Sequence, residues 1–233
     1  MNPKQLFLDI ETASQVNGFQ NLDPEWQELW SLKSRYFLEK EPSKPVEEVY
    51  TEKAAIYAEF GQIICISVGI LDDGNFRVKS FLGDELTILT DFFALISKSY
   101  NDARFSIFIG HNVKEFDIPY ICRRAIINGV SIPPSLELYG KKPWEVSHIH
   151  DTLEMWKFGD FKHFISLDLL AKCLHLPSSK QDIRGSDVGR VFWVDQDIQR
   201  ISRYCQQDVL LTARVYRKLK GDNEIKDDQV VWL

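Results

Sequence analysis

The order of hydrophobic and polar positions predicts strands early in the chain and helices later. The apolar run "KQLFLDI" at 4–10 predicts a short buried strand that stops at a pair of carboxylates. The segment "GQIICISVGILDDGNFRVKSFLG" at 61–83 has two β-rich runs around an Asp-Asp-Gly-Asn turn, which predicts two antiparallel strands. "RFSIFIG" at 104–110 supplies a fourth strand.

Apolar residues at helical spacing dominate the later segments. Asp84 can cap a helix whose apolar positions are Leu86, Leu89, Phe93 and Ile96. The same period predicts helices within 115–130, ending at Gly129, within 166–176 and within 195–220. The region 131–165 is expected to be rich in loops. Strands followed by alternating helices predict an α/β fold with a mixed central sheet and helices packed on it.

Between the first two strands lies a long segment without a strand pattern, which we interpret as an insertion covering residues 13–59. It contains a predicted helix with Asp23 as N-cap, Pro24 in the first turn, and Trp26 and Trp30 one turn apart. Two such tryptophans can stack on bases, but they are more often the buried stripe of a helix, which is the interpretation we favour.

Length and composition indicate one domain with its own core. The 233 residues are 44% hydrophobic and 27% charged, which are ordinary globular values. We therefore expect a single domain over residues 1–220 and a polar C-terminal tail over 221–233, whose final "VVWL" could dock on another surface. The formal charge of −6 argues against a broad basic surface that binds long nucleic acids, although it allows local binding of the end of a nucleic-acid chain.

Cysteine usage and the terminal sequence bear on the cellular setting. Cys65, Cys122, Cys173 and Cys205 are widely separated and form no Cys-x-x-Cys motif, which predicts reduced thiols and a cytoplasmic protein. The start "MNPKQLFLDIET" lacks the apolar run of a signal peptide, and no apolar stretch is long enough to span a membrane.

Carboxylates occur where predicted strands and helices end. Asp9 and Glu11 share one face of the first strand, and Asp117 stands at the start of the helix after the fourth strand. Asp208 lies one helical turn after Tyr204, on the same face of the last helix. Taken singly, these residues are typical of a solvated strand end, a helix cap and a surface acid.

Together these motifs resemble a known nuclease superfamily. "FLDIET" at 7–12, "GHNVKEFDIPY" at 110–120 and "YCQQDVLLT" at 204–212 are similar, in order and spacing, to the three exonuclease motifs of the DEDD superfamily. Tyr204 stands four residues before Asp208, and Arg203 occupies the place of the histidine in the other branch, so the chain resembles the DEDDy type. It is similar to the proofreading exonuclease domain of family-B DNA polymerases, particularly its stand-alone bacterial form.

The resemblance implies a ribonuclease H-like fold with a five-stranded mixed sheet flanked by helices. It implies a 3′–5′ exonuclease acting on the 3′ end of single-stranded DNA with two divalent cations, Mg²⁺ or Mn²⁺, and releasing 5′-nucleoside monophosphates. Such hard cations fit a convergence of carboxylates, which cannot all ionise side by side without positive charge. The main alternatives are an exoribonuclease on short RNA and a non-catalytic protein that binds nucleic-acid ends. Protein partners remain open.

The implied roles fall on eight residues. Asp9 would bridge both cations, Glu11 and Asp208 would complete the site of the attacking water, and Asp117 would support the second cation. Tyr204 would orient the water, since a phenol with a pKa near 10 is a poor base at neutral pH. The residues implied to contact the terminal nucleotide are Thr12, Asn112 and Phe116.

Two further features of the sequence allow either a structural or a functional interpretation. His148, His150 and Asp151 in "HIHD" could bind a transition metal, but we favour a loop or strand end because no further ligand spacing accompanies them. Lys114 and the pair Arg123 and Arg124 could guide a nucleic-acid strand. For the two arginines we favour a solvated helix face.

Overall fold

The computed structural model describes residues 3–160, 162–177 and 182–233, and its centre is a mixed β-sheet with the strand order β5-β4-β1-β2-β3-β6. β1 pairs antiparallel with β2 and parallel with β4; the pairs β4·β5 and β3·β6 are parallel, and β2·β3 is antiparallel. The strands are β1 (Lys4–Ser14), β2 (Gly61–Asp72), β3 (Asn75–Phe81), β4 (Ser106–Gly110), β5 (Ile149–Asp151) and β6 (Val230–Trp232).

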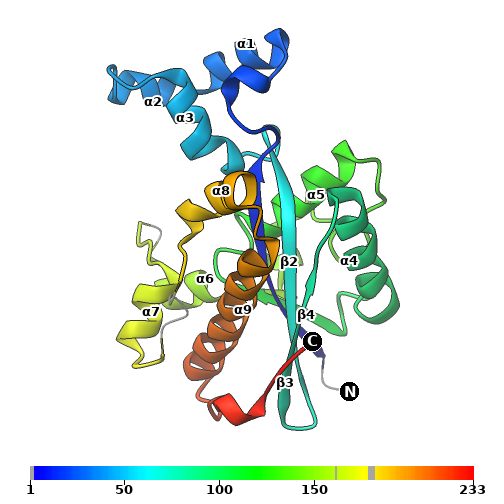
Figure 1. Cartoon of the computed structure of the whole chain (residues 1–233). Coiled ribbons are helices and arrows are strands. Elements are labelled where there is room, and N and C mark those ends of the chain that lie inside the picture. Colours follow the sequence, from blue (N-terminus) through cyan, green and yellow to red (C-terminus); the bar gives the residue numbers. More distant parts are fainter. Residues whose placement is uncertain (1–2, 161, 178–181) are drawn as a thin grey trace.

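Helices cover both faces of the sheet (Figure 1). One face packs against α4 (Glu85–Ser99) and α5 (Asp117–Ile127), and the other against the long α9 (Ile198–Lys220). The other α-helices of the described residues are α1 (Pro24–Lys33), α2 (Arg35–Lys40), α3 (Val46–Lys53), α6 (Thr152–Lys157), α7 (Leu167–Cys173) and α8 (Val188–Arg190). The predicted α/β architecture is confirmed.

Successive side chains of β1 point to opposite faces of the sheet, and this alternation determines which helices each side chain packs against. Leu6, Leu8 and Ile10 are buried against α4 and α5, whereas Phe7 is buried against α9. Ile10 shares the face of Leu6 and Leu8 because the strand keeps its two-residue period. The strand also does not stop at its carboxylates: pairing with β2 continues through Ser14, after a register shift between Glu11 and Thr12.

Gly69 in β2 allows α9 to lie close to the sheet. A Cβ atom placed there would come within 2.4 Å of the Phe76 ring and 2.8 Å of Val209 Cγ1. Since Val209 follows Asp208 on α9, this close approach helps to set the position of the face that carries Tyr204 and Asp208.

We predict that Gly69→Ala lowers the free energy of unfolding by about 1–3 kcal/mol, because overpacking forces the ring or the helix to shift. Gly189→Ala is the matched control, since a Cβ there meets nothing within 4 Å and alanine favours the helical backbone. Urea unfolding of both variants measures the difference. Equal stability of the two variants would contradict the proposed close contact.

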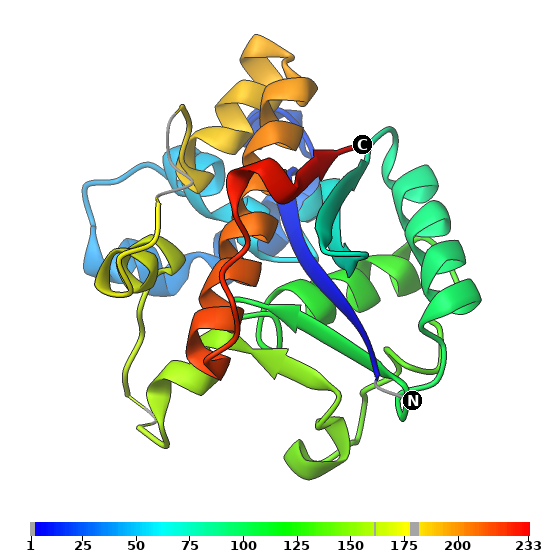
Figure 2. The same cartoon turned by 90° about the horizontal axis from the view of Figure 1, so that it is seen from below.

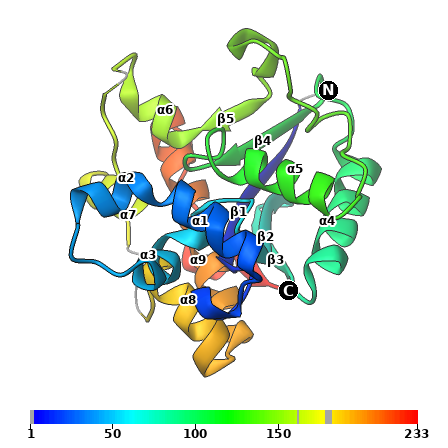
Figure 3. The ribbon, with the colours of Figure 1, turned by 90° about the horizontal axis from the view of Figure 1, so that it is seen from above.

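The insertion forms a small helical unit with its own apolar cluster. Trp30 is fully buried, and its ring centroid lies 5.2 Å from that of Tyr50 and 5.0 Å from that of Phe60. Trp26 packs on Phe60 at 5.3 Å. The buried-stripe interpretation of the two tryptophans is therefore confirmed. Figures 1 and 3 show helices α1 to α3 at the same end of the sheet as α8.

The end of the chain adds a sixth strand to the five that were expected. Figure 2 shows β6 beside β3, and the Leu233 amide donates to Val78 O. Arg214 on α9 anchors the preceding segment, because it donates to Ile225 O and to Asp227. Residues 221–233 are therefore docked on the sheet and on α9, rather than forming a polar tail.

Other local predictions hold in part. Asp84 caps α4 as expected, by accepting from the Thr87 amide, but Leu86 is 50% exposed and Ile88 and Phe92 take the buried positions. The region 131–165 contains β5 and α6, so it is less rich in loops than predicted. Arg124 is buried instead of solvated.

The buried position of Arg124 joins three segments of the fold. Its guanidinium forms a 2.5 Å ion pair with Glu85 of α4 and donates to Ala58 O. The neighbouring Arg123 is exposed, as predicted. Among the described residues, no helix is long and apolar enough to cross a membrane.

Candidate active site

Asp9 and Glu11 lie on β1, on the face that α9 covers, because they follow Phe7 at intervals of two residues. The parallel partner β4 ends at Gly110, and its pairing with β1 ends where Phe7 meets Ile109. Both carboxylates therefore lie beyond the end of a neighbouring strand, at an edge where α/β folds commonly bind ligands. Glu11 is only 9% exposed.

Asp117 takes the position that a longer β4 would occupy. It is the first residue of α5, is buried, and accepts a 3.1 Å hydrogen bond from the Ile10 amide. Since Ile10 lies between Asp9 and Glu11, this bond brings the third acid beside the first two.

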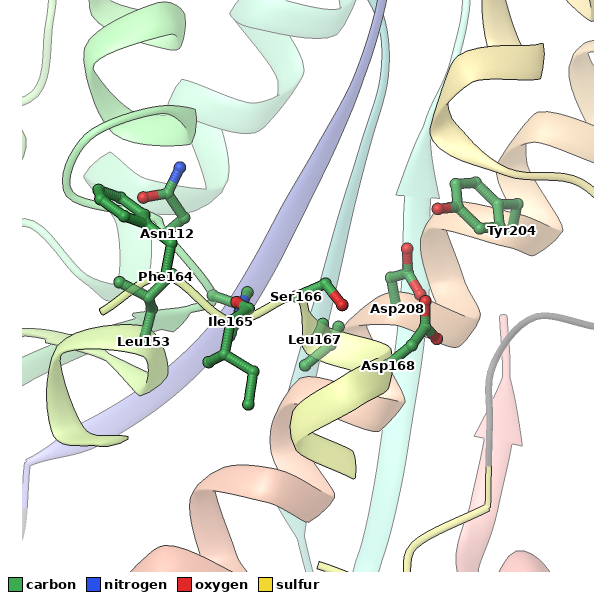
Figure 4. Close-up of a pocket in the computed structure, with 10 residues that line it drawn as sticks. Asn112, Leu153, Phe164, Ile165, Ser166, Leu167, Asp168, Tyr204 and Asp208 are labelled. Carbon is green, nitrogen blue, oxygen red and sulfur yellow. The ribbon is translucent and has the colours of Figure 1, made fainter. Parts of the chain in front are cut away.

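Tyr204 and Asp208 approach from α9, one turn apart, and both are half-buried. Figure 4 shows the Tyr204 hydroxyl directed toward the side of the cavity where Asp208 lies. The neighbouring Arg203 is exposed. The structure thus brings Tyr204 and the four predicted acids together from a strand and two helices.

Burial and mutual repulsion disfavour the ionised acids. Burial raises the pKa of Asp9 well above its ordinary value, and the charges of Asp117 and Asp208 raise it further. The pKa of Glu11 is raised in the same way, first by burial and then by Asp9 and Asp208. Burial also raises the pKa of Asp117 to about 7. Within the described part of the chain, no basic side chain forms an ion pair with Asp9, Glu11 or Asp117.

Tyr204 is held in its protonated form. Burial raises the pKa of its hydroxyl, and the charges of Asp208 and Glu11 raise it further. A phenol in this environment can donate a hydrogen bond but is unsuited to removing a proton at neutral pH.

Two cavities flank the carboxylates. The first, of about 430 Å³, is lined by Tyr204, Asp208 and Asn112, together with residues of the 164–168 segment (Figure 4). The second, of about 490 Å³, is lined by Glu11 and Phe116, by Thr12 and by residues of the insertion and of the 185–194 segment. Asp9, which is half-buried, and Asp117, which is fully buried, line neither cavity.

The three residues implied to contact a nucleotide are distributed over both cavities. Asn112 has a left-handed backbone, with φ at 63°, and its buried Oδ1 has no hydrogen-bond partner within the described part of the chain. The Thr12 hydroxyl donates to Ala55 O at 2.8 Å, which ties β1 to the end of the insertion. Phe116 packs on Tyr120 with a centroid distance of 5.4 Å.

Asp151 positions the loop that carries Asn112, a role that the sequence analysis missed. Its carboxylate accepts hydrogen bonds from the amides of Asn112, Lys114 and Leu153, at 2.9, 3.1 and 2.9 Å. His111 fixes the other side of this loop through Thr152 Oγ1 and Ile165 O, both at 2.9 Å. A carboxylate at the end of β5 is the only sequence signal that could have indicated this role.

The two histidines of the "HIHD" segment have structural roles, in line with the interpretation that we favoured from the sequence. His148 Nε2 lies 2.9 Å from Ser135 O, and His150 Nδ1 lies 2.8 Å from the Tyr216 hydroxyl. Lys114, which could have guided a strand, forms a 2.6 Å ion pair with Glu154.

Phe164 and Asp168 are two further residues of the site that the sequence analysis did not single out. Both line the first cavity, and Figure 4 shows the Asp168 side chain beside that of Asp208. Phe164 is 66% exposed, and Lys157 Nζ lies 4.4 Å from its ring centroid. The predicted helix within 166–176 contains Asp168, but helical spacing gives no reason to separate it from a capping acid.

Comparison with known proteins gives concordant results. Residues 56–227 match a family model described as a predicted 3′–5′ exonuclease related to the exonuclease domain of PolB. A DNA polymerase of Archaeoglobus fulgidus is 27% identical over 164 residues, which are 67% of this chain and 20% of that protein.

The family B DNA polymerase of the archaeon Pyrobaculum calidifontis superimposes with a TM-score of 0.60 at 17% identity, over 94% of this chain and 25% of that one. The chain thus spans about a fifth to a quarter of these relatives, and the shared part has the ribonuclease H-like fold. The match covers Asp117, Tyr204 and Asp208 and begins after Asp9 and Glu11. This chain belongs to the family of predicted 3′–5′ exonucleases related to the exonuclease domain of PolB.

Proposed function

We propose that this protein is a metal-dependent 3′–5′ exonuclease that removes nucleotides from the 3′ end of single-stranded DNA. The observation that carries the proposal is the convergence of Asp9, Glu11, Asp117 and Asp208 with Tyr204 at one edge of the sheet. The family match supports nuclease chemistry, and the polymerase relatives favour DNA as the substrate.

The donor set fits divalent cations. Buried carboxylates that raise one another's pKa are stabilised by nearby positive charge, and oxygen ligands are those that Mg²⁺ and Mn²⁺ prefer. Asp9, Glu11 and Asp208 would hold one ion, while Asp9 and Asp117 would hold or support the second. Two such ions supply an activated water and stabilise the leaving oxygen of the phosphodiester.

The residues of the chain orient the substrate around this centre. Tyr204 keeps its proton and would donate to the attacking water, which fixes the direction of attack. Asn112 Oδ1, which has no partner among the described residues, would accept from the terminal nucleotide in the first cavity. Phe116 and Thr12 line the second cavity, where a base or sugar would pack. The products would be 5′-nucleoside monophosphates.

Matched DNA and RNA oligonucleotides, labelled at the 5′ end, test the proposal. We expect single-nucleotide shortening of the DNA with Mg²⁺ or Mn²⁺ and none with a chelator. If the RNA is shortened faster than the DNA, the substrate is RNA and not DNA. Binding of both strands without any cleavage would favour an end-binding protein and contradict the proposal.

A further inference from the structure

A thiol lies among the carboxylates of the candidate site. Cys205 Sγ is 3.3 Å from Asp9 Oδ2 and 3.4 Å from Asp9 O, and it is fully buried. One ligand atom each of Asp9, Glu11 and Cys205 lies within 4.8 Å of the other two. Two acids and a thiolate, completed by water, are a four-coordinate ligand set suited to zinc-like ions.

Glu11 provides an independent indication of a ligand. The residue is 9% exposed, borders the second cavity, and forms no hydrogen bond or ion pair with another described residue. A buried carboxylate in this state is costly unless a cation or a proton compensates it.

We propose that Asp9, Glu11 and Cys205 form a site for one thiophilic divalent cation of the zinc class. The inference rests on the proposed role of Asp9 and Glu11 as metal ligands. On binding, a metal–sulfur bond replaces the S–H bond of Cys205, the proton leaves to solvent, and no oxidant or reductant takes part. The site uses the same two carboxylates as the proposed pair of hard ions. The thiophilic ion therefore competes with Mg²⁺ and blocks cleavage.

The position of Cys205 on α9 explains how one site can accept two kinds of ion. Cys205 immediately follows Tyr204 and lies three residues before Asp208, so thiol and carboxylate are neighbours on the helix face directed at β1. Soft thiolate ligands favour zinc-like ions, whereas Mg²⁺ is held by oxygen alone. Coordination by the Cys205 thiolate therefore favours a zinc-like ion, and coordination by the carboxylates without it favours Mg²⁺.

Cadmium provides a direct readout on the full chain, because Cd²⁺ bound to thiolate absorbs in the ultraviolet. We expect a charge-transfer band that saturates at one ion per chain, is lost in Cys205→Ser and is weakened in Asp9→Asn. Cys173→Ser is the matched control, since Cys173 is exposed at the end of α7. Circular dichroism of each variant confirms that it is folded.

The outcomes separate this inference from the proposed function. A band that survives in Cys205→Ser, or disappears in Cys173→Ser, overturns the inference. Excess Mg²⁺ should shift the wild-type Cd²⁺ titration to higher concentration, and the absence of any shift would also overturn the shared site. The titration contains no nucleic acid, so a Cys205-dependent band without oligonucleotide cleavage would refute only the proposed nuclease activity.

Discussion

Replacing Asp9 by asparagine is expected to reduce metal-dependent shortening of an oligonucleotide by about 10³-fold or more, because losing a carboxylate shared by two cations forfeits several kcal/mol of transition-state stabilisation. Asparagine preserves the size of the side chain, so the packing between β1 and α9 is retained. Asp208→Asn is expected to act in the same way from the α9 side. Initial rates with saturating Mg²⁺ measure the effect.

Two variants sharpen this test. Asp91→Asn removes an exposed acid of α4, on the other side of the sheet, and should leave the rate unchanged. Tyr204→Phe should lower the rate by about 100-fold, because it removes an orienting hydroxyl, while Mg²⁺ still raises the melting temperature. Near-normal cleavage by Asp9→Asn would contradict the proposed role of Asp9 as a metal ligand.

The stability of the metal-free protein is expected to fall as the pH rises. A carboxyl group whose pKa is raised by folding binds its proton more tightly in the folded chain. The stabilisation is complete below the pKa of the unfolded carboxyl, about 4, and is lost as the pH rises through about 7, the pKa of buried Asp117. Each unit corresponds to about 1.4 kcal/mol, so Asp117 alone contributes a few kcal/mol. Asp9 and Glu11 shift in the same direction.

Urea unfolding in a chelator, compared at about pH 5 and about pH 8, measures this dependence. Asp117→Asn should flatten it, since asparagine resembles the protonated acid and can still accept from the Ile10 amide. Mg²⁺ should restore stability at the higher pH, because in the proposed site it would bind the ionised acids of the folded chain. Stability that rises between these pH values would contradict the raised pKa values.

Local periodicity predicted the parts of the site that lie within one element. The two-residue period of a strand places Asp9 and Glu11 on one face, and the helical period places Tyr204 beside Asp208. That these two faces meet depends on the close approach of α9 at Gly69, which no spacing reveals. Before the structure, only the resemblance of the three motifs brought them together.

The residues that were misjudged have partners far away in the sequence. Arg124 has the spacing of a solvated helix face, yet it pairs with Glu85, 39 residues earlier, because α4 and α5 pack side by side. Asp151 holds the loop at Asn112, also 39 residues earlier, through its carboxylate. Cys205 was predicted only to be a reduced thiol, since its distance to Asp9 is fixed by the packing of α9 on β1.

The strand β6 bears on how these molecules behave toward one another. By pairing with β3 it covers backbone N–H and C=O groups that would otherwise form an open sheet edge. Removing residues 226–233 would therefore leave the four acids of the candidate site in place but expose more of the β3 backbone, which a second copy can extend. β6 thus puts a strand of three residues at the edge of the sheet in place of the seven-residue β3, and a short edge strand offers a second copy less backbone to pair with.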